Sequence, residues 1–575
     1  MSNSLSPWPW LPLLFLLGGC QTLNLPNRSE APDETSRPLP FERKVTPPAE
    51  MSPDLVYNYL AGEIGIQRGA TRTTFEHLLA AAREAKDPVA AAQAARMALQ
   101  MNDLDKAAEA ARLWVEYDPN ALAARQLATV LALRRGRKDE ALEQAEAAIR
   151  IAEATGKDGF FELAGVLAGE RRADKIELMR ALAARHPDDP RAHYALALVA
   201  SQRKRYDLAF QELERASRLK PQWDKPWLLH AQLLRLQGRV KEAEAGLRQA
   251  AREHPSATLW QALGRMLMQQ KRHDDALEAF QKAARLDPEN EELRTAIGLL
   301  AIETKKWELA RETWLALTKS RNAARRQEAW FFLGQIEELR KRPERAAEYY
   351  RKITSGRFLQ EARLRLAILT GQAGRLEEAS RLFRELRLTH PHQAVQLYVT
   401  EAQLYKEQGH PQKAMALYDE AIAANPANPD LLYARGLLAA DMGDVAQAER
   451  DLRKVLELQP EDPDALNALG YTLADQTDRL DEAFEYIRRA LEKLPDSAPI
   501  LDSMGWVLYR MGRREEALEY LQKAAAKLQD GEIAAHLGEV LWSLDRREEA
   551  RRVWDEALRF DPDNPKLQET LRRFR

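Results

Sequence analysis

The feature that most constrains this chain is a sequence unit that recurs along most of its length. It is clearest in residues 224–290, where two consecutive copies stand in register, with equivalent positions 33 residues apart. The matched pairs are Trp227 and Trp260, Ala231 and Gly264, Ala243 and Ala276, Leu247 and Phe280, Ala250 and Ala283, and Pro255 and Pro288. A period of this length is typical of arrays of supersecondary units and not of a single compact domain.

Each unit is predicted to be a pair of amphipathic helices. Trp260, Leu263 and Leu267 fall on one face of a helix. Gly264 lies on the same face, where a small residue lets a second helix approach closely, and Ala276 has the matching role on that second helix. One such hairpin cannot bury its apolar face alone, whereas stacked hairpins can, which predicts a solenoid stabilised by contacts between neighbours.

These positions resemble the tetratricopeptide repeat (TPR) family. The resemblance implies an all-α solenoid of TPR helix hairpins, wound into an open superhelical spiral. Prolines that end a unit recur through the chain, at Pro119, Pro187, Pro221, Pro255, Pro288, Pro391, Pro426, Pro460, Pro495 and Pro562. We expect about fifteen hairpins over residues 51–564, several of them degenerate, and a short polar C-terminal cap over residues 565–575.

Some units depart from the repeat pattern. Tyr57, Leu60 and Ile64 are predicted to open the first hairpin. The fourth hairpin is degenerate because Lys175 stands where its second helix should carry a small residue. Trp227, Trp260 and Trp330 match the aromatic position of the repeat itself, so we interpret them as core residues and not as ligand-binding residues.

The N-terminal residues MSNSLSPWPWLPLLFLLGGC are similar to a bacterial lipoprotein signal. An apolar run from Leu11 to Leu17 is too short to span a bilayer as a mature helix, and Leu17-Gly18-Gly19-Cys20 follows the leucine–small–small–cysteine pattern. The resemblance implies that residues 1–19 are a signal peptide and that Cys20 is lipidated, including by palmitate. The segment departs from secretory signals in having no Lys or Arg before its apolar run. The alternative is an ordinary cysteine after a chance apolar run.

Residues 20–50 join this cysteine to the repeats. They contain Pro26, Pro32, Pro38, Pro40, Pro47 and Pro48 with few large apolar residues, which predicts an extended tether. A cysteine carrying more than one acyl chain holds a protein stably on a membrane. Gln21, in place of the aspartate common in inner-membrane lipoproteins, favours an outer-membrane anchor with the repeats facing the periplasm.

The sequence offers no sign of catalysis. With 86 basic and 88 acidic residues it lacks the basic excess of a nucleic-acid binder, and a single cysteine excludes a disulfide within the chain or a cysteine metal cluster. No catalytic or nucleotide-binding motif is present, and we expect no enzyme activity, metal or cofactor. His186-Pro187, His254-Pro255 and His390-Pro391 share one place in the repeat, at a helix C-terminus, where histidine is favourable. We therefore read them as helix ends and not as metal ligands.

Five aromatic residues stand out because they lie at positions of the first helix that, in the TPR family, face the concave groove. Counting the small residue of that helix as position 8, they are Tyr433 at position 5, Tyr471 and Trp506 at position 9, and Tyr509 and Trp542 at position 12. Tyrosine and tryptophan are common anchors in protein interfaces, so these five are the candidate partner-binding groove. The alternative is packing between neighbouring repeats.

Two further patterns bear on the partner. Only Asn58 and Asn467 fall in predicted helices, so the asparagine ladder that grips a peptide backbone in some family members is absent. This favours folded partners over an extended peptide. Basic clusters are predicted to be solvated turns between the two helices of a unit; they are Arg134-Arg135, Arg171-Arg172, Arg203-Lys204-Arg205 and Arg513-Arg514.

The signal and the segment DKAAEAARLWVEYDPNALAARQL are similar to those of outer-membrane TPR lipoproteins that partner a periplasmic carboxyl-terminal processing protease. This resemblance implies an adaptor that binds the protease and its peptidoglycan hydrolase substrates, promotes their proteolysis and so regulates cell-wall turnover. One alternative is a lipoprotein scaffold of an exopolysaccharide secretion complex or another envelope assembly. A second alternative, from a different class, is an enzyme.

Overall fold

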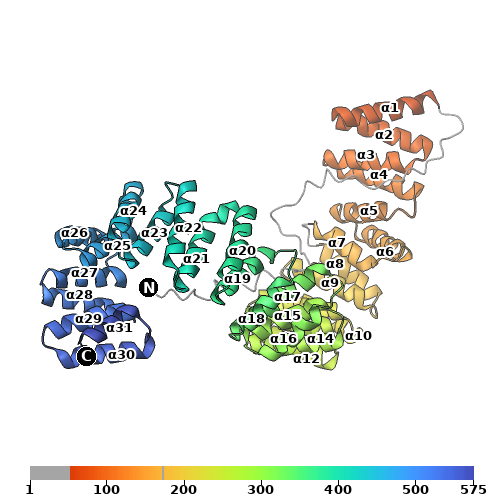
Figure 1. Ribbon diagram of the computed structural model, residues 1–575. Coiled ribbons are helices and arrows are strands. Elements are labelled where there is room, and N and C mark those ends of the chain that lie inside the picture. The colour runs from red at the N-terminus through yellow and green to blue at the C-terminus, as the bar shows by residue number, and fades with distance from the viewer. Residues whose placement is uncertain (1–51, 171–173, 575) are drawn as a thin grey trace. The chain divides into compact units, whose positions relative to one another are not determined.

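A computed structural model describes residues 52–170 and 174–574 of the chain. In these residues the fold is the predicted all-α TPR solenoid: fifteen antiparallel helix pairs and one last helix follow one another along the chain (Figure 1). We call the first helix of each pair, with an odd number, helix A, and the second, with an even number, helix B. The predicted signal peptide, the predicted lipidation site Cys20 and the predicted tether of residues 20–50 lie outside the described residues.

The chain divides into two compact units, with the boundary between Thr313 and Trp314, inside α16 (Trp307–Leu317). The helices of the first unit are α1 (Pro53–Arg68), α2 (Thr71–Ala85), α3 (Pro88–Gln100), α4 (Leu104–Tyr117), α5 (Leu122–Arg134), α6 (Lys138–Ala154), α7 (Gly159–Ala168), α8 (Asp174–Arg185), α9 (Pro190–Gln202), α10 (Tyr206–Leu219), α11 (Asp224–Leu236), α12 (Val240–Glu253), α13 (Ala257–Gln269), α14 (His273–Leu286) and α15 (Glu291–Glu303).

The helices of the second unit are α17 (Ala323–Leu339), α18 (Pro343–Arg351), α19 (Leu359–Gln372), α20 (Leu376–Thr389), α21 (Ala394–Glu407), α22 (Pro411–Ala424), α23 (Pro429–Asp441), α24 (Val445–Leu458), α25 (Pro463–Gln476), α26 (Leu480–Lys493), α27 (Ala498–Arg510), α28 (Arg514–Lys527), α29 (Gly531–Ser543), α30 (Arg547–Phe560) and α31 (Pro565–Phe574). A short 3₁₀ turn, η2 (Pro391–Gln393), lies between α20 and α21.

Small residues set the distance between the two helices of a pair, as predicted. A Cβ atom on Gly264 of α13 would lie 2.9 Å from the ring of Phe280 in α14, and Ala276 is fully buried between the two helices. The same arrangement recurs in the second unit, where a Cβ on Gly505 would lie 2.5 Å from Leu521. Interiors of proteins have no room for such extra atoms, so glycine at these places fixes the close packing of the hairpin.

The basic clusters lie at the turns between helix A and helix B. Many of these turns contain one residue in the left-handed region, either glycine, as at Gly512, or another residue, as at Lys204. The arginine that follows donates to an acidic residue in the first turn of helix B: Arg513 to Glu516, with Nε to Oε1 at 2.7 Å, in an exposed pair. The pair Arg171-Arg172 lies outside the described residues.

The histidine–proline pairs mark helix ends. His254 and His390 are the C-cap residues of α12 and α20, and the ring of His254 stacks on Trp227 at a centroid distance of 6.1 Å. His186 contacts the Glu146 carboxylate at 3.3 Å. Each of the three histidines therefore contacts residues of its own or a neighbouring repeat.

Lys175 shows how the degenerate fourth hairpin is accommodated. Its side chain is buried in α8, where its Nζ donates to the carbonyl oxygen of Leu167 at 2.9 Å. The lysine thereby pairs with a carbonyl at the C-terminal end of α7, which is only 10 residues long. Burial lowers the pKa of the Lys175 ammonium below its usual value.

The first hairpin differs from the sequence prediction. Its contact with α2 is made by Leu55 and by two glycines, Gly62 and Gly65, which are the buried residues of α1. Tyr57, Leu60 and Ile64 lie in α1, the first helix of this hairpin, as predicted, but expose 61%, 59% and 47% of their surface. The periodicity correctly indicates a helix, but these three side chains lie outside its close contact with α2; only the Tyr57 ring meets α2, edge-on against the ring of His77 at a centroid distance of 5.3 Å.

Candidate partner-binding surface on the second unit

The second unit has a distinct inner face, formed by its A helices. From α19 to α31, each helix A contacts the helix A of the next repeat. Side chains at the predicted groove positions lie on this inner face, because they reach from one helix A to another. For example, the Tyr471 hydroxyl of α25 donates to Glu532 of α29, two repeats further on, at 2.6 Å. We call the surface that carries positions 5, 9 and 12 of these helices the inner face.

The upstream part of the inner face is apolar. Leu364 and Ile368 of α19 occupy positions 5 and 9, Val399 of α21 occupies position 5, and Tyr433 and Leu437 of α23 occupy positions 5 and 9. All five pack on the adjoining core clusters and remain half-buried. We call them the inner-face apolar stripe. Half-buried apolar side chains on neighbouring helices are a surface on which a protein partner can bury more apolar area.

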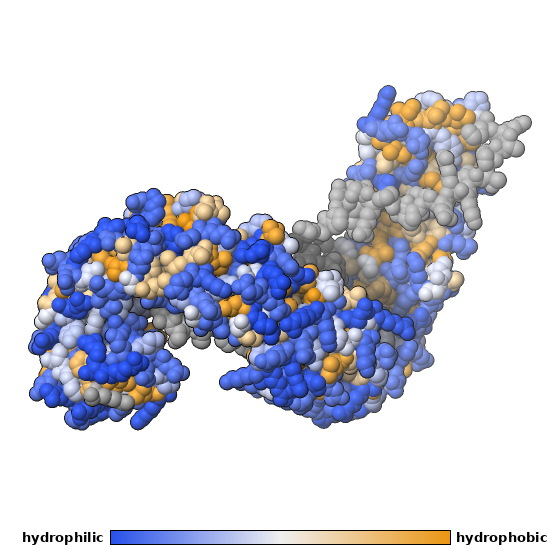
Figure 2. All heavy atoms as spheres, in the orientation of Figure 1, coloured by the Kyte–Doolittle hydropathy of each residue, from blue (hydrophilic) through white to orange (hydrophobic). Residues whose placement is uncertain are grey.

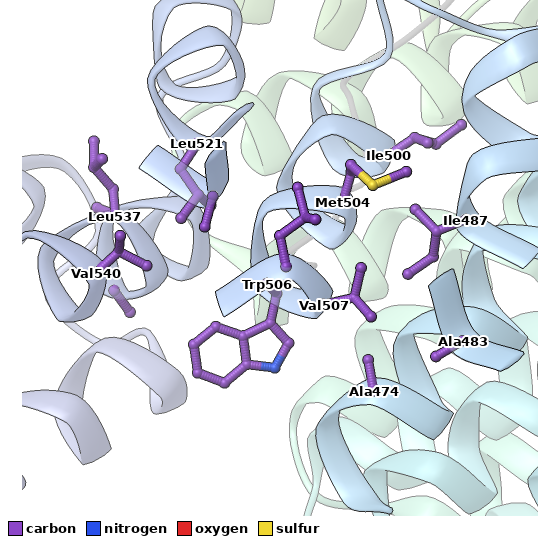
Figure 3. Packing of buried hydrophobic residues seen from close by; sticks show 14 of the residues in the cluster. Ala474, Ala483, Ile487, Ile500, Met504, Trp506, Val507, Leu521, Leu537 and Val540 are labelled. Carbon is purple, nitrogen blue, oxygen red and sulfur yellow. The ribbon is translucent and has the colours of Figure 1, made fainter. Parts of the chain in front are cut away.

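Further along, the inner face becomes a polar and aromatic network centred on Trp506. The indole Nε1 of Trp506 donates to the carboxylate of Asp475 at 3.1 Å. Its ring stacks on His536 at a centroid distance of 4.1 Å and an interplanar angle of 20°. In Figure 3, Met504 of the same helix points toward Ile487 and Ile500, whereas Trp506 points to the other side. Its contacts with Asp475 and His536 leave Trp506 only 5% exposed.

His536 and Asp502 form a buried pair within this network. The His536 Nδ1 lies 3.0 Å from Asp502 Oδ2, and both side chains are almost fully buried. Burial lowers the pKa of His536, but the Asp502 carboxylate and its hydrogen bond outweigh this and raise that pKa above its usual value. A protonated imidazole beside a carboxylate is the arrangement in which both buried groups are compensated.

Two further contacts tie distant A helices together. Tyr471 donates to Glu532, and its hydroxyl lies 3.5 Å from His536 Nε2; burial raises the pKa of the Tyr471 phenol well above its usual value. The Lys566 Nζ of α31 donates to Asp475 of α25 at 3.0 Å, across 91 positions of sequence. These contacts connect α25, α27, α29 and α31 across the inner face.

The five predicted groove residues therefore do not form one site. Tyr471, Trp506 and Tyr509 come together, with the Tyr509 ring centroid 5.4 Å from that of Trp506. Trp542 lies elsewhere, stacked on Trp554 at 5.9 Å and flanked by the guanidinium of Arg547 at 5.3 Å. Tyr433 belongs to the apolar stripe, and burial raises its pKa to about 12.

Much of the network was missed by sequence reasoning, which selected aromatic residues alone. The omitted members are Asp475, Asp502, Glu532, His536 and Lys566. A usable signal existed: Asp502 and His536 lie at positions 5 and 6 of helices whose surroundings are otherwise apolar. A charged residue at such a position needs a partner, and two of them in consecutive repeats indicate a pair.

The described residues add two findings about chemistry. No group of three or more His, Cys, Asp or Glu side chains in residues 52–170 and 174–574 is placed to hold a metal ion. Within the same residues, no helix combines the length and the apolar character needed to cross a bilayer.

Comparison with protein families agrees with the repeat pattern. A tetratricopeptide repeat model matches residues 167–222, 228–291, 295–358, 433–498 and 503–565, and a second one matches residues 395–438. Together these segments cover more than half of the chain. The chain belongs to the tetratricopeptide repeat family. Members of this family bind other proteins, and the TPR fold is typically a non-catalytic scaffold, so the repeats serve protein–protein interaction.

Individual relatives are similar over different lengths. TPR repeat-containing protein PA4667 of Pseudomonas aeruginosa is 32% identical over 92% of this chain and 89% of its own length. Human tetratricopeptide repeat protein 7A is 25% identical over 53% of this chain and 37% of that protein. A tetratricopeptide repeat protein from Parabacteroides merdae, solved by crystallography, is 19% identical over 43% of this chain and 97% of its own, with a TM-score of 0.36.

Proposed function

We propose that this TPR protein is a lipid-anchored adaptor of the outer membrane, facing the periplasm. In this proposal it binds a carboxyl-terminal processing protease together with peptidoglycan hydrolases, promotes their cleavage and so regulates cell-wall turnover. It has no catalytic role of its own. The observation that carries the binding function is the inner-face apolar stripe, which leaves five apolar side chains half-buried on three consecutive A helices.

Three observations support the finer parts of the proposal. The N-terminal residues are similar to a lipoprotein signal ending at Cys20. The signal and residues 105–127 resemble LbcA, an outer-membrane TPR lipoprotein of Pseudomonas that partners such a protease. The chain is also similar to a Pseudomonas TPR protein over nearly its whole length. A long repeat surface that holds two proteins together raises their effective concentration, which promotes cleavage without any catalytic residue in the adaptor.

A pull-down from detergent-solubilised envelopes tests the partner assignment. The tagged full-length chain is expected to recover a carboxyl-terminal processing protease, with hydrolases enriched when the nucleophile of the protease is disabled. A variant with Leu364→Gln and Val399→Gln on the stripe should recover at least five-fold less hydrolase, since each change removes apolar area from the interface. Leu382→Gln with Leu417→Gln is the matched control, because these half-buried leucines lie on the B helices α20 and α22 of the same repeats.

The alternatives predict other outcomes of the same experiment. Recovery of polysaccharide export components without a protease would contradict the adaptor and favour a secretion scaffold. A Cys20→Ala chain should leave the membrane fraction but still bind its partners in vitro, which separates anchoring from recognition. Equal loss in the stripe variant and in the B-helix control would show that the stripe is not the binding surface.

A further inference from the structure

Helix α1 exposes an apolar stripe that no helix B among the described residues covers; its one ring contact is that of Tyr57 with His77 of α2, at a centroid distance of 5.3 Å. Tyr57, Leu60 and Ile64 follow the i, i+3, i+7 spacing of one helical face and expose 61%, 59% and 47% of their surface. Figure 2 shows hydrophobic residues gathered over α1, at the upper right of the view. Single exposed apolar residues need no explanation, whereas a large apolar patch marks an interaction site.

The repeat register shows what usually covers this face. The A–B turn of α1 has its left-handed residue at Gly69, so Tyr57, Leu60 and Ile64 lie 12, 9 and 5 positions before it. In α9, counted back in the same way from Lys204, the equivalent residues are Ala192, Ala195 and Val199, which are buried. In α27, counted back from Gly512, they are Ile500, Ser503 and Val507, which are also buried.

In both cases the cover is helix B of the preceding repeat. Ala192, Ala195 and Val199 share a core cluster with Met179 and Leu182 of α8. Ile500 and Val507 share a cluster with three residues of α26 at i, i+4 and i+7 spacing, namely Ala483, Ile487 and Ala490, and Figure 3 shows Ile487 and Ala483 beside Val507. The stripe on α1 therefore corresponds to the helix A side of a helix B–helix A interface, and residues 52–170 contain no helix B that packs on it.

The other end of the chain is closed in the way that solenoids require. The last helix, α31, packs on α29, buries Leu567 and Leu571, and stacks Phe574 against Trp554 at 5.8 Å. Terminal repeats of a solenoid need such a cap with a polar outer side. The described residues thus include a cap helix, α31, and a helix A, α1, that no described helix B covers.

The sequence of residues 21–50 differs from that of a helix B. The B helices next to the two examples are 12 and 14 residues long. Residues 21–50 hold six prolines, and the longest interval between two of them is the six residues 41–46. Proline inside a helix removes a backbone donor and clashes with the preceding turn, so the sequence of residues 21–50 does not match that of a helix B.

A second copy of the chain is also a poor fit. The three exposed side chains present on the order of 300 Å² together, whereas a stable interface buries about 800 Å² on each partner. In a symmetric contact the same small patch would be the interface on both sides. A different protein is not limited in this way, since it can bury the stripe with one helix and add contacts from its own surroundings.

We propose that the stripe on α1 docks an amphipathic α-helix of a partner protein, which takes the place of the absent helix B. The partner helix would be about 14 residues long and carry apolar residues at i, i+4 and i+7. As in Ala483, Ile487 and Ala490 of α26, a larger apolar residue would stand between two small ones. This is helix-in-groove recognition, in which the partner helix packs on α1 as a helix B packs on the helix A of the next repeat. The surface is separate from the inner-face apolar stripe, and the proposal does not depend on the identity of the adaptor's partners.

Photo-crosslinking of the full-length chain in the cells that make it tests this proposal. Benzoylphenylalanine at Tyr57 is expected to crosslink to a residue within an amphipathic helical segment of another protein, at least ten-fold more than the same group at Arg72. Arg72 is the control because it lies on α2 with 80% of its side chain exposed. A crosslink to a second copy, to the chain's own N-terminal residues or to lipid, or no adduct above the Arg72 control, would overturn the proposal.

A variant in which an added helix of the chain itself covers α1 provides a second test of the proposal. Residues 37–54 are replaced with the sequence of residues 480–497, which comprises α26 and its following turn, so that Leu55 takes the place that Ala498 has after α26. The grafted helix should cover α1, raise the thermal midpoint by several degrees and abolish the Tyr57 crosslink. The same graft with serine at the positions of Ala483, Ile487 and Ala490 should do neither. If both grafts behave alike, the face of α1 is not a helix-binding surface.

Discussion

Replacing Asp502 with alanine should lower the free energy of unfolding of the C-terminal repeats by about 3 kcal/mol, because it leaves His536 buried without its carboxylate partner. This loss lies at the lower end of the range for breaking a buried ion pair, because the unpaired imidazole of His536 can become neutral by releasing its proton. In a repeat protein such a loss is local. It should therefore appear as faster amide hydrogen exchange in α27 and α29, with little change in the first unit.

The control for this prediction is an exposed ion pair of the same repeat. Glu516 accepts from Arg513 at the start of α28, and both side chains are largely exposed. Pairs of this kind contribute little to stability, so Glu516→Ala should leave amide exchange unchanged. Equal exchange in the Asp502→Ala and Glu516→Ala chains would show that the buried pair does not stabilise this end of the solenoid.

The same pair makes stability depend on pH with a definite sign. The pKa of His536 in the folded chain lies above the usual 6.5, so its contribution is complete below about pH 6.5 and is lost as the pH rises through the folded value. Burial also raises the pKa of Asp502, which acts in the same direction. Glu532, Tyr471 and Lys566 face the pair from the neighbouring helices. The denaturation midpoint should fall between pH 6 and pH 8, and fall less in His536→Gln.

Trp554→Ala should have an effect at least as large, a loss of about 3–5 kcal/mol from the last repeat. Trp554 is 2% exposed in α30 and stacks on Trp542 and on Phe574 of the cap helix, at centroid distances of 5.9 and 5.8 Å. Alanine leaves a cavity against Gly538, whose missing Cβ is the reason that the indole fits. We expect α29, α30 and α31 to exchange amide protons as one unfolded unit.

Phe560→Ala is the matched control for this substitution. Phe560 ends the same helix and is 45% exposed, so its truncation removes much less buried area. Similar exchange of α31 in the Trp554→Ala and Phe560→Ala chains would contradict a capping role for the Trp554 cluster.

The fold followed from the sequence because each repeat position has one physical role. Gly264, Ala276 and Phe280 recur with a fixed period, and the structure places them together at the contact between helices A and B. Proline marks the end of helix B because it cannot continue a helix. Local preference and global packing agree at these positions, which is why pattern reading succeeds there.

Other features depend on contacts between distant residues, which periodicity does not report. Trp506 looks like a groove anchor by its position, but it is buried because His536 and Asp475 come from neighbouring A helices. Lys566 meets Asp475 across 91 positions of sequence. Helical period alone also could not tell that Leu60 and Ile64 stay exposed, since two glycines form the close contact of that hairpin.

The most direct test of the adaptor proposal is a cleavage assay with purified components. The full-length chain, a periplasmic carboxyl-terminal processing protease and a peptidoglycan hydrolase are mixed, and loss of intact hydrolase is followed with and without the chain. We expect the chain to accelerate cleavage at least ten-fold and to cleave nothing without the protease, and we expect the variant with Leu364→Gln and Val399→Gln to lose most of the acceleration. An unchanged cleavage rate in the presence of the chain would contradict the adaptor function.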